Sequence, residues 1–355
     1  MIILCTADNH IGFKQYGLKQ REKDIEDSFF RILETGVKIN AAAITVSGDL
    51  LHSVRPTSST VGFLKKCQEY LYDNNLPCLV SEGNHDKSKP HWITNISRKD
   101  RSKGFVFLDN EKYDLDGFNI FGNSFTTRDN FDKGSYVPRE TDLLLMHQQF
   151  SEFANFPNEK IFDCNDFQNL KKPTTVVVGD IHITNDFVCE DGHRVYSPGS
   201  TELMSESESE KKYVCVYDTD KGTISHQDIV TRNVIRLEVR EDNDIEPAIS
   251  TINKSEQGSM VFIKFNTSVE NIISRIRSAT RDSEPIIRPK PIMEFNGKEV
   301  DFSDEIESDL TLNDVLQEMI DDKNPIYEIA SQLTNPEADV VSMIDEFVEK
   351  RIKEI

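Results

Sequence analysis

Short apolar segments alternate with helix-length segments over the first 110 residues, and this alternation restricts the fold more than any other feature of the chain. The expected strands are residues 2–7, 41–48, 76–83 and 104–109, and the expected helices are about residues 21–38 and 60–73. Strands separated by helices of this length form parallel βαβ units. The first part of the chain is therefore predicted to have an α/β fold.

From about residue 111 the apolar segments become shorter and follow one another more closely. They include "GFNIFG", "DLLLMH", "TTVVVGD", "RVYSPG" and "YVCVYD". This pattern predicts a second sheet that packs on the first. The expected architecture of residues 1–232 is therefore a four-layer α/β sandwich.

Two further regions are expected after the sandwich. Residues 233–300 alternate strand-like and helix-like segments, which predicts a small α+β capping domain. Residues 301–355 are predicted to form an acidic linker and a pair of helices. The second helix would carry an apolar stripe at helical spacing, formed by Val340, Val341, Ile344, Phe347, Val348 and Ile352. Such a stripe must pack on the first helix, on the body of the protein or on a partner.

The charge is unevenly distributed along the 355 residues. The net charge is −21, and residues 301–355 hold 16 acidic against 4 basic residues, which leaves −9 on the first 300. A strongly acidic chain does not adhere to nucleic acid non-specifically. Because the tail holds over half of the excess, a nucleic-acid substrate for the first 300 residues stays open.

The sequence lacks the usual signals of secretion and membrane insertion. The start "MIILCTADNH" has no basic region and no small-residue cleavage site,. No apolar stretch approaches the roughly 20 residues of a membrane helix. The six cysteines are scattered, so neither a zinc cluster nor a disulfide framework is expected,. We therefore expect a cytoplasmic protein with no membrane partner.

Acidic and histidine side chains follow five of the expected strands. They are Asp8 and His10, Asp49 and His52, the run Asn84, His85 and Asp86, then His147, and finally Asp180 and His182. Five of the eight histidines of the chain occupy these positions. Because the loops at the carboxyl ends of strands in an α/β sheet converge on one crevice, these side chains are expected to lie together.

A cluster of carboxylates and imidazoles is unstable unless a cation lies among them. Two divalent cations that share a bridging carboxylate fit this mixture of oxygen and nitrogen donors. Both side chains of an Asp-x-His pair point to the same side of an extended strand, so one pair can bind one metal. Each motif alone has a structural explanation, such as a turn or a hydrogen-bonded core histidine, and only the five together indicate a metal site. His91, His193 and His226 are predicted to be structural or surface residues.

The order of these motifs resembles that of the calcineurin-like metallophosphoesterases. Within them the chain is similar to the SbcD-type DNA double-strand-break repair nucleases, a branch that includes a recombination endonuclease subunit of T-even phages. Three segments carry this narrower resemblance, namely "GDLLHSVRP", "LLLMHQQF" and "YSPGSTELMS". The similarity covers residues 1–232 and is one of architecture alone beyond them. It implies a DNA exonuclease or endonuclease that processes DNA ends for recombination and repair.

The resemblance also implies a role for each residue of the cluster. One metal would be bound by Asp8, His10, Asp49 and His182, and the other by Asp49, Asn84, His147 and Asp180. The catalytic residues would be His85, which acts on the leaving 3′ oxygen, Asp86, which orients His85, and His52, which contacts the scissile phosphate. Asp180 departs from the family pattern, which has histidine there. An added carboxylate shifts the site toward hard cations. With three carboxylates, Asn84 and three imidazoles as donors, manganese is the expected metal and magnesium the alternative.

The resemblance further implies an SMC-like coiled-coil ATPase of the SbcC type as a partner, docked through the C-terminal helices, and a homodimer. The short chain and Asp180 favour a bacteriophage origin, which would place the protein in the host cytoplasm. Two other functions stay open. A stand-alone metallophosphatase or phosphodiesterase could act on a protein or a small molecule, although it would need neither the capping domain nor the tail. A scaffold subunit without metals is disfavoured by the complete set of ligand residues.

Overall fold

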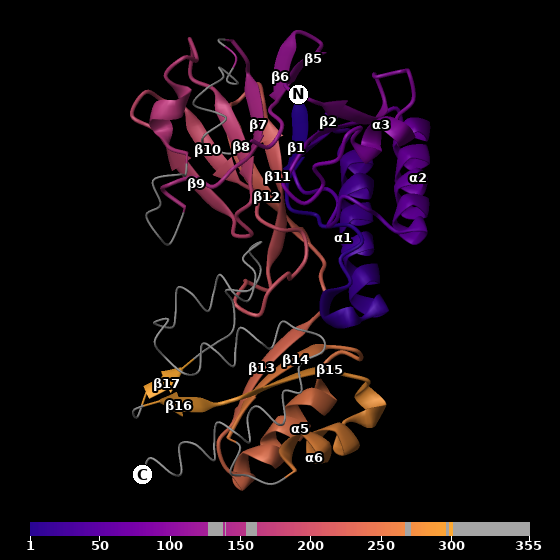
Figure 1. Ribbon diagram of the computed structural model, residues 1–355, viewed down its shortest axis with the longest axis vertical. Helices are drawn as coiled ribbons and strands as arrows, with labels where there is room; N and C mark the ends of the chain where they lie inside the picture. The colour runs from indigo at the N-terminus through magenta and orange to yellow at the C-terminus, as the bar shows by residue number, and fades with distance from the viewer. Residues whose placement is uncertain (127–137, 139, 154–161, 267–270, 296–297, 301–355) are drawn as a thin grey trace, which may run out of the picture.

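The computed structural model describes residues 1–126, 138, 140–153, 162–266, 271–295 and 298–300. The acidic linker and the two helices expected in residues 301–355 lie outside these residues. Two six-stranded sheets form the larger part of the molecule, and a three-stranded sheet lies beyond them (Figure 1). The expected α/β fold is confirmed. Among the described residues, no helix is long and apolar enough to cross a membrane.

The first sheet has the strand order β12-β11-β1-β2-β3-β4. Its parallel strands lie within the four segments predicted from the sequence, as β1 (Ile2–Thr6), β2 (Ala43–Ser47), β3 (Pro77–Ser81) and β4 (Gly104–Leu108). The antiparallel strands are β11 (Lys212–Asp218) and β12 (Thr223–Ile229). One face of the sheet is covered by α1 (Lys19–Lys38), α2 (Ser58–Asp73) and α3 (Trp92–Ile96) (Figure 1).

The second sheet packs on the opposite face of the first. Its strands, in spatial order, are β5 (Glu111–Leu115), β6 (Phe118–Gly122), β7 (Leu143–His147), β8 (Thr175–Gly179), β10 (Arg194–Ser197) and β9 (Asn185–Val188). Successive side chains of a strand point to opposite faces. In β1, Leu4 packs against the helices while Ile3 and Cys5 pack between the sheets. The apolar runs of the sequence are therefore strands buried on both faces.

The described residues cover part of the outer face of the second sheet. In the described residues it is packed by Phe150, Phe162 and the 3₁₀ helix η2 (Cys164–Phe167), with no α-helix among them. Three regular layers of the predicted four are thus described. A disulfide joins Cys164 to Cys189. This corrects the expectation of unpaired cysteines, because tertiary packing brings together two residues 25 positions apart that no short motif connects. The other four cysteines are free and buried.

A small α+β unit follows the two large sheets. It contains the parallel strands β13 (Val234–Val239), β14 (Met260–Phe265) and β15 (Ile286–Pro291). One face is covered by α5 (Ile245–Lys254) and α6 (Ile272–Ala279), with Ile252 and Ile276 in the core. The other face packs through Met260 and Phe262 on Leu203 of the large unit. The remaining elements are the strands β16 (Met293–Phe295) and β17 (Lys298–Val300) and the 3₁₀ helices η1 (Gln15–Gly17), η3 (Asp242–Asp244) and η4 (Arg281–Ser283).

Candidate metal centre

The seven residues expected to bind metal lie together at the carboxyl ends of five strands. Strands β1, β2 and β3 of the first sheet and strands β7 and β8 of the second supply them. Several groups have ligand atoms within 4.8 Å of one another, including Asp8 with His10 and His182, and Asp8 with Asp49 and His147. The cluster therefore spans the junction of the two sheets, so neither sheet alone could form it.

Glycines allow the strand ends to approach this closely. A Cβ atom on Gly48 would lie 2.2 Å from Nδ1 of His147, and one on Gly83 would lie 2.0 Å from Oδ1 of Asp49. Real Cβ contacts are not that short, so a larger residue at either position would displace the ligands. Gly48 and Gly83 are thus required because the site leaves no room for a side chain at these positions.

Asp49 lies between two sides of the cluster, with His147 on one side and His10 on the other. Its Oδ1 accepts a hydrogen bond of 2.9 Å from the backbone N–H of His85. Its Oδ2 lies 3.2 Å from Nε2 of His147 and 3.7 Å from Nε2 of His10. A carboxylate with one oxygen held by the backbone and the other facing two histidines is placed as a bridging ligand would be.

His147 presents one nitrogen to the cluster and binds the fold with the other. Nδ1 lies 3.0 Å from the carbonyl oxygen of Ser47, to which it donates, and Nε2 lies 2.9 Å from Oδ1 of Asn84. Burial alone would lower the pKa of His147. The carboxylates of Asp49, Asp8 and Asp180 raise this pKa by more, so that it lies well above its ordinary value,. Positive charge is therefore strongly favoured at this position, whether from a proton or from a metal.

The other side of the cluster contains a potential ligand atom that has no hydrogen-bond partner. Oδ1 of Asp8 accepts a 3.0 Å hydrogen bond from the backbone N–H of Asp180, whereas Oδ2 is buried and has no hydrogen-bond partner. Burial raises the pKa of Asp8 to about 6. Nε2 of His10 faces Nε2 of His182 at 3.3 Å. A buried unpaired carboxylate oxygen beside two facing imidazole nitrogens fits a divalent cation.

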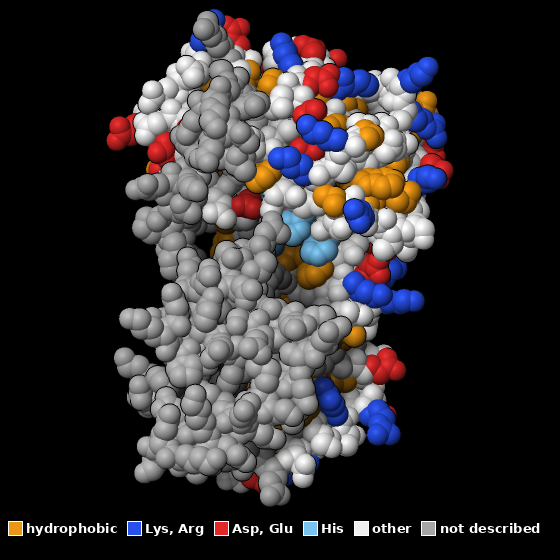
Figure 2. Space-filling model, in the orientation of Figure 1, with side chains coloured by type: hydrophobic (Ala, Val, Ile, Leu, Met, Phe, Trp, Pro, Cys, Tyr) orange, Lys and Arg blue, Asp and Glu red, His pale blue; other side chains and the backbone are white. Residues whose placement is uncertain are grey.

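His85 and His52 lie at the solvent side of the cluster, and both are partly exposed. Nδ1 of His85 lies 3.2 Å from the carbonyl oxygen of His52, and the two rings stack with centroids 5.3 Å apart. Phe13 stacks on the other side of His52 at 4.1 Å. Burial, with a contribution from His85, lowers the pKa of His52 to about 4. Figure 2 shows histidine side chains at the surface in a hollow of the molecule.

No protein-family model matches the chain. Among solved structures, the nuclease MPE of Pseudomonas putida aligns with 63% of this chain and 87% of its own at 14% identity, with a TM-score of 0.29. Two relatives carry the name DNA double-strand break repair protein Mre11. The one from Methanocaldococcus jannaschii is 28% identical over 290 residues, which are 74% of this chain and 76% of the relative. The one from Sulfolobus acidocaldarius is 23% identical over 305 residues, which are 81% of this chain and 74% of the relative.

The chain is thus similar to Mre11-type DNA double-strand break repair proteins over about three quarters of its length. It is accordingly a metal-dependent phosphodiester hydrolase, a class of enzyme that the paired carboxylates and imidazoles of the site suit.

Asp86, which was expected to orient His85, makes hydrogen bonds to backbone amides. Its Oδ2 accepts hydrogen bonds from the backbone N–H groups of Leu50 (3.0 Å) and Leu51 (3.4 Å), and its Oδ1 accepts one from Gly83 (2.7 Å). The ring of His85 contacts the carbonyl oxygen of His52 instead. Asp86 therefore ties the loop after β3, which carries His85, to the loop after β2.

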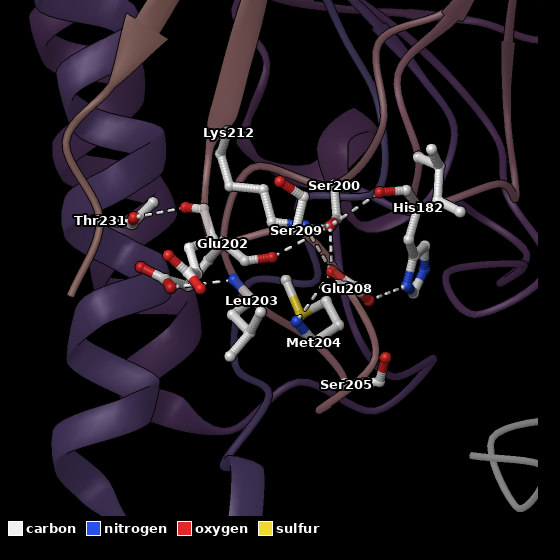
Figure 3. A network of polar contacts seen from close by, with 12 residues as sticks. His182, Ser200, Glu202, Leu203, Met204, Ser205, Glu208, Ser209, Lys212 and Thr231 are labelled. Carbon is white, nitrogen blue, oxygen red and sulfur yellow. Dashed lines mark hydrogen bonds and ion pairs between the residues drawn. The ribbon is translucent and has the colours of Figure 1, made fainter. Parts of the chain in front are cut away.

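The sequence pattern gave no indication of Glu208. The alternating serines and glutamates of "SESESE" (205–210) are typical of a solvated loop, yet Glu208 is only 6% exposed. Its Oε1 accepts a 2.9 Å hydrogen bond from Nδ1 of His182 (Figure 3). Since Glu206 and Glu210 occur in the same alternating pattern, local sequence could not distinguish the buried glutamate. Of the histidines expected to be structural, His91 caps α3 and His193 accepts from the backbone N–H of Thr174.

Proposed function

We propose that this metallophosphoesterase is a two-metal DNA nuclease that processes DNA ends in double-strand-break repair. The position of Asp49 carries the proposal, because its Oδ2 faces histidines from both sides of the cluster at 3.2 and 3.7 Å. A single metal site would not need a carboxylate there. DNA as the substrate is supported by the two archaeal relatives, whose names state DNA double-strand break repair.

One ion would be held by Asp8, His10, Asp49 and His182, and the other by Asp49, Asn84, His147 and Asp180. The first set contains the unpaired Oδ2 of Asp8, and in the second set Oδ1 of Asp180 lies 3.7 Å from Nε2 of His147. Two bound cations would lower the pKa of the attacking water and neutralise charge on the phosphate. The many carboxylate oxygens beside three imidazoles favour manganese, with magnesium as the alternative.

The chain's own residues would complete the reaction. The Nδ1–H of His85 can donate to the carbonyl oxygen of His52, which leaves Nε2 to face the substrate. In the imidazolium form Nε2 also carries a proton, which it would transfer to the leaving 3′ oxygen, and the ring would become neutral. His52, held between Phe13 and His85, would contact the scissile phosphate as a neutral donor, since its pKa is lowered to about 4. Both residues lie on loops that the metal ligands also fix.

We further propose that the enzyme acts with an SMC-like coiled-coil ATPase of the SbcC type, which would bind the predicted C-terminal helices, and that it forms a homodimer. Residues 233–300 would be the capping domain. These proposals rest on the family resemblance and on the apolar stripe predicted between Val340 and Ile352.

A cleavage assay tests the function directly. Linear duplex and hairpin DNA would be incubated with the full chain in Mn²⁺, in Mg²⁺ and in a chelator, with and without the ATPase. We expect Mn²⁺-dependent cleavage that the chelator abolishes. A phosphopeptide and p-nitrophenyl phosphate serve as comparison substrates. Efficient hydrolysis of either one, with intact DNA, would instead indicate a phosphatase.

A further inference from the structure

We propose that Glu208 is a positioning residue that determines which nitrogen of His182 faces the metal centre. The inference rests on the proposed metal site and extends it by a residue that is not itself a ligand. It also explains why a charged side chain is buried in the 205–210 loop.

The contact between the two side chains defines the orientation of the ring. Nδ1 of His182 lies 2.9 Å from Oε1 of Glu208, and a carboxylate can only accept a hydrogen bond at that distance,. A ring proton is therefore placed on Nδ1, and Nε2 faces Nε2 of His10 at 3.3 Å, where it can present its lone pair to a metal. Carboxylate–histidine–metal arrangements of this kind fix the tautomer and raise the basicity of the ligand.

Glu208 is held as a charged group by several donors. Its Oε2 accepts from the hydroxyl of Ser200 at 2.9 Å and from the backbone N–H of Met204 at 3.2 Å, and it forms an ion pair with Lys212 at the start of β11 (Figure 3). A carboxylate surrounded by these donors accepts at both of its oxygens.

The small α+β unit holds the same loop from the other side. The guanidinium of Arg236, on β13, donates to the carbonyl oxygens of Glu206 (2.9 Å) and Glu208 (3.0 Å). It also pairs with the carboxylate of Glu210. Arg236 therefore links the unit beyond the two large sheets to the backbone of the residue that orients His182, so its loss should affect the ring weakly and in the same direction.

The affinity for Mn²⁺ distinguishes a positioning role of Glu208 from a merely structural role. Full-length Glu208→Ala and Glu208→Gln would be titrated with Mn²⁺ by calorimetry, with Glu206→Ala as the control, because it removes the same charge from the same loop. We expect Glu208→Ala to weaken one of the two ions by about 10- to 100-fold. The isosteric glutamine keeps an acceptor and should recover part of this loss, while the control should stay within about twofold of the wild type.

A second measurement determines the protonation and coordination of the His182 ring. In the zinc-loaded protein, ¹⁵N NMR should show His182 of the wild type protonated at Nδ1 and coordinated through Nε2, and Glu208→Ala should lose this uniform state. Equal Mn²⁺ affinities and an unchanged ring in a folded Glu208→Ala would overturn the inference alone. If Glu208→Ala does not fold, unchanged results for Glu208→Gln and Arg236→Ala together would overturn it. A wild-type chain that binds no divalent ion would refute the metal site as well.

Discussion

His147, the last residue of β7, and His182, which follows β8, show two ways of orienting a proposed metal ligand. His147 donates from Nδ1 to the backbone carbonyl of Ser47, and its side chain is 0% exposed. His182 donates from Nδ1 to the side chain of Glu208, and its own side chain is 25% exposed. The first ligand is held by the strand ends of the two sheets, and the second by a loop that enters the site from outside them.

This difference has a mechanical consequence. A backbone carbonyl cannot be removed by substitution, so the His147 side should tolerate changes in neighbouring side chains. The His182 side depends on a carboxylate, a lysine and the loop that carries them. The comparison can therefore be tested by substituting Asp49, which contacts both sides, His85, whose side chain is a proposed ligand on neither, and Asp180, which contacts the His147 side.

Removal of the carboxylate between the two sides should have the largest effect. Asp49 faces both His147 and His10, so we expect Asp49→Ala to lose both ions and all measurable cleavage. Calorimetric titration with Mn²⁺ and a DNA-cleavage assay would measure this. A variant that still bound two ions with wild-type affinity would show that Asp49 does not bridge.

His85→Ala should leave both sides intact and still abolish the reaction. The contact of His85 with Asp49 comes from the backbone N–H, which alanine retains. We expect Mn²⁺ affinities within about threefold of the wild type and cleavage lowered by about 10²- to 10⁴-fold, the usual contribution of a proton donor. Loss of metal as severe as in Asp49→Ala would contradict the assignment of His85 to the substrate.

Asp180 should affect the His147 side more than the His182 side. Its Oδ1 lies 3.7 Å from Nε2 of His147. We expect Asp180→Ala to weaken one ion by about tenfold or more, and Asp180→His, which restores the family pattern, to keep activity in Mn²⁺. Two-site calorimetric fits would measure both variants. A metal-bound structure with the Asp180 carboxylate more than about 3 Å from either ion would refute the prediction, because oxygen ligands lie at roughly 2–2.6 Å.

The tail should have the smallest effect on the metal centre, because none of the predicted ligands lies in it. Deletion of residues 305–355 should leave Mn²⁺-dependent cleavage within about twofold and eliminate co-purification with the ATPase. Phe347→Asp on the predicted apolar stripe should have the same effect, while Ser342→Asp, off the stripe, should not. Unchanged affinity of the truncated chain for the ATPase would show that the docking element lies elsewhere.

The sequence by itself determined the strands and the residue types at their ends. Runs such as Val176–Val178, in β8, are too apolar to be anything but buried. The same local pattern occurs in β1 to β4, so these strands could be predicted closely. Parallel strands bring their carboxyl ends to one edge, which is why Asp8, Asp49 and Asn84 could be expected together.

Only the tertiary structure decided which polar groups hold those residues in place. The choice of Glu208 over Glu206, the use of Asp86 on backbone amides and the pairing of Cys164 with Cys189 all depend on segments that are distant in sequence or identical in local pattern. A hydrogen-bond partner is selected by the position of two atoms after the sheets have packed. Periodicity and motif spacing carry no information on that position, since they describe one segment at a time.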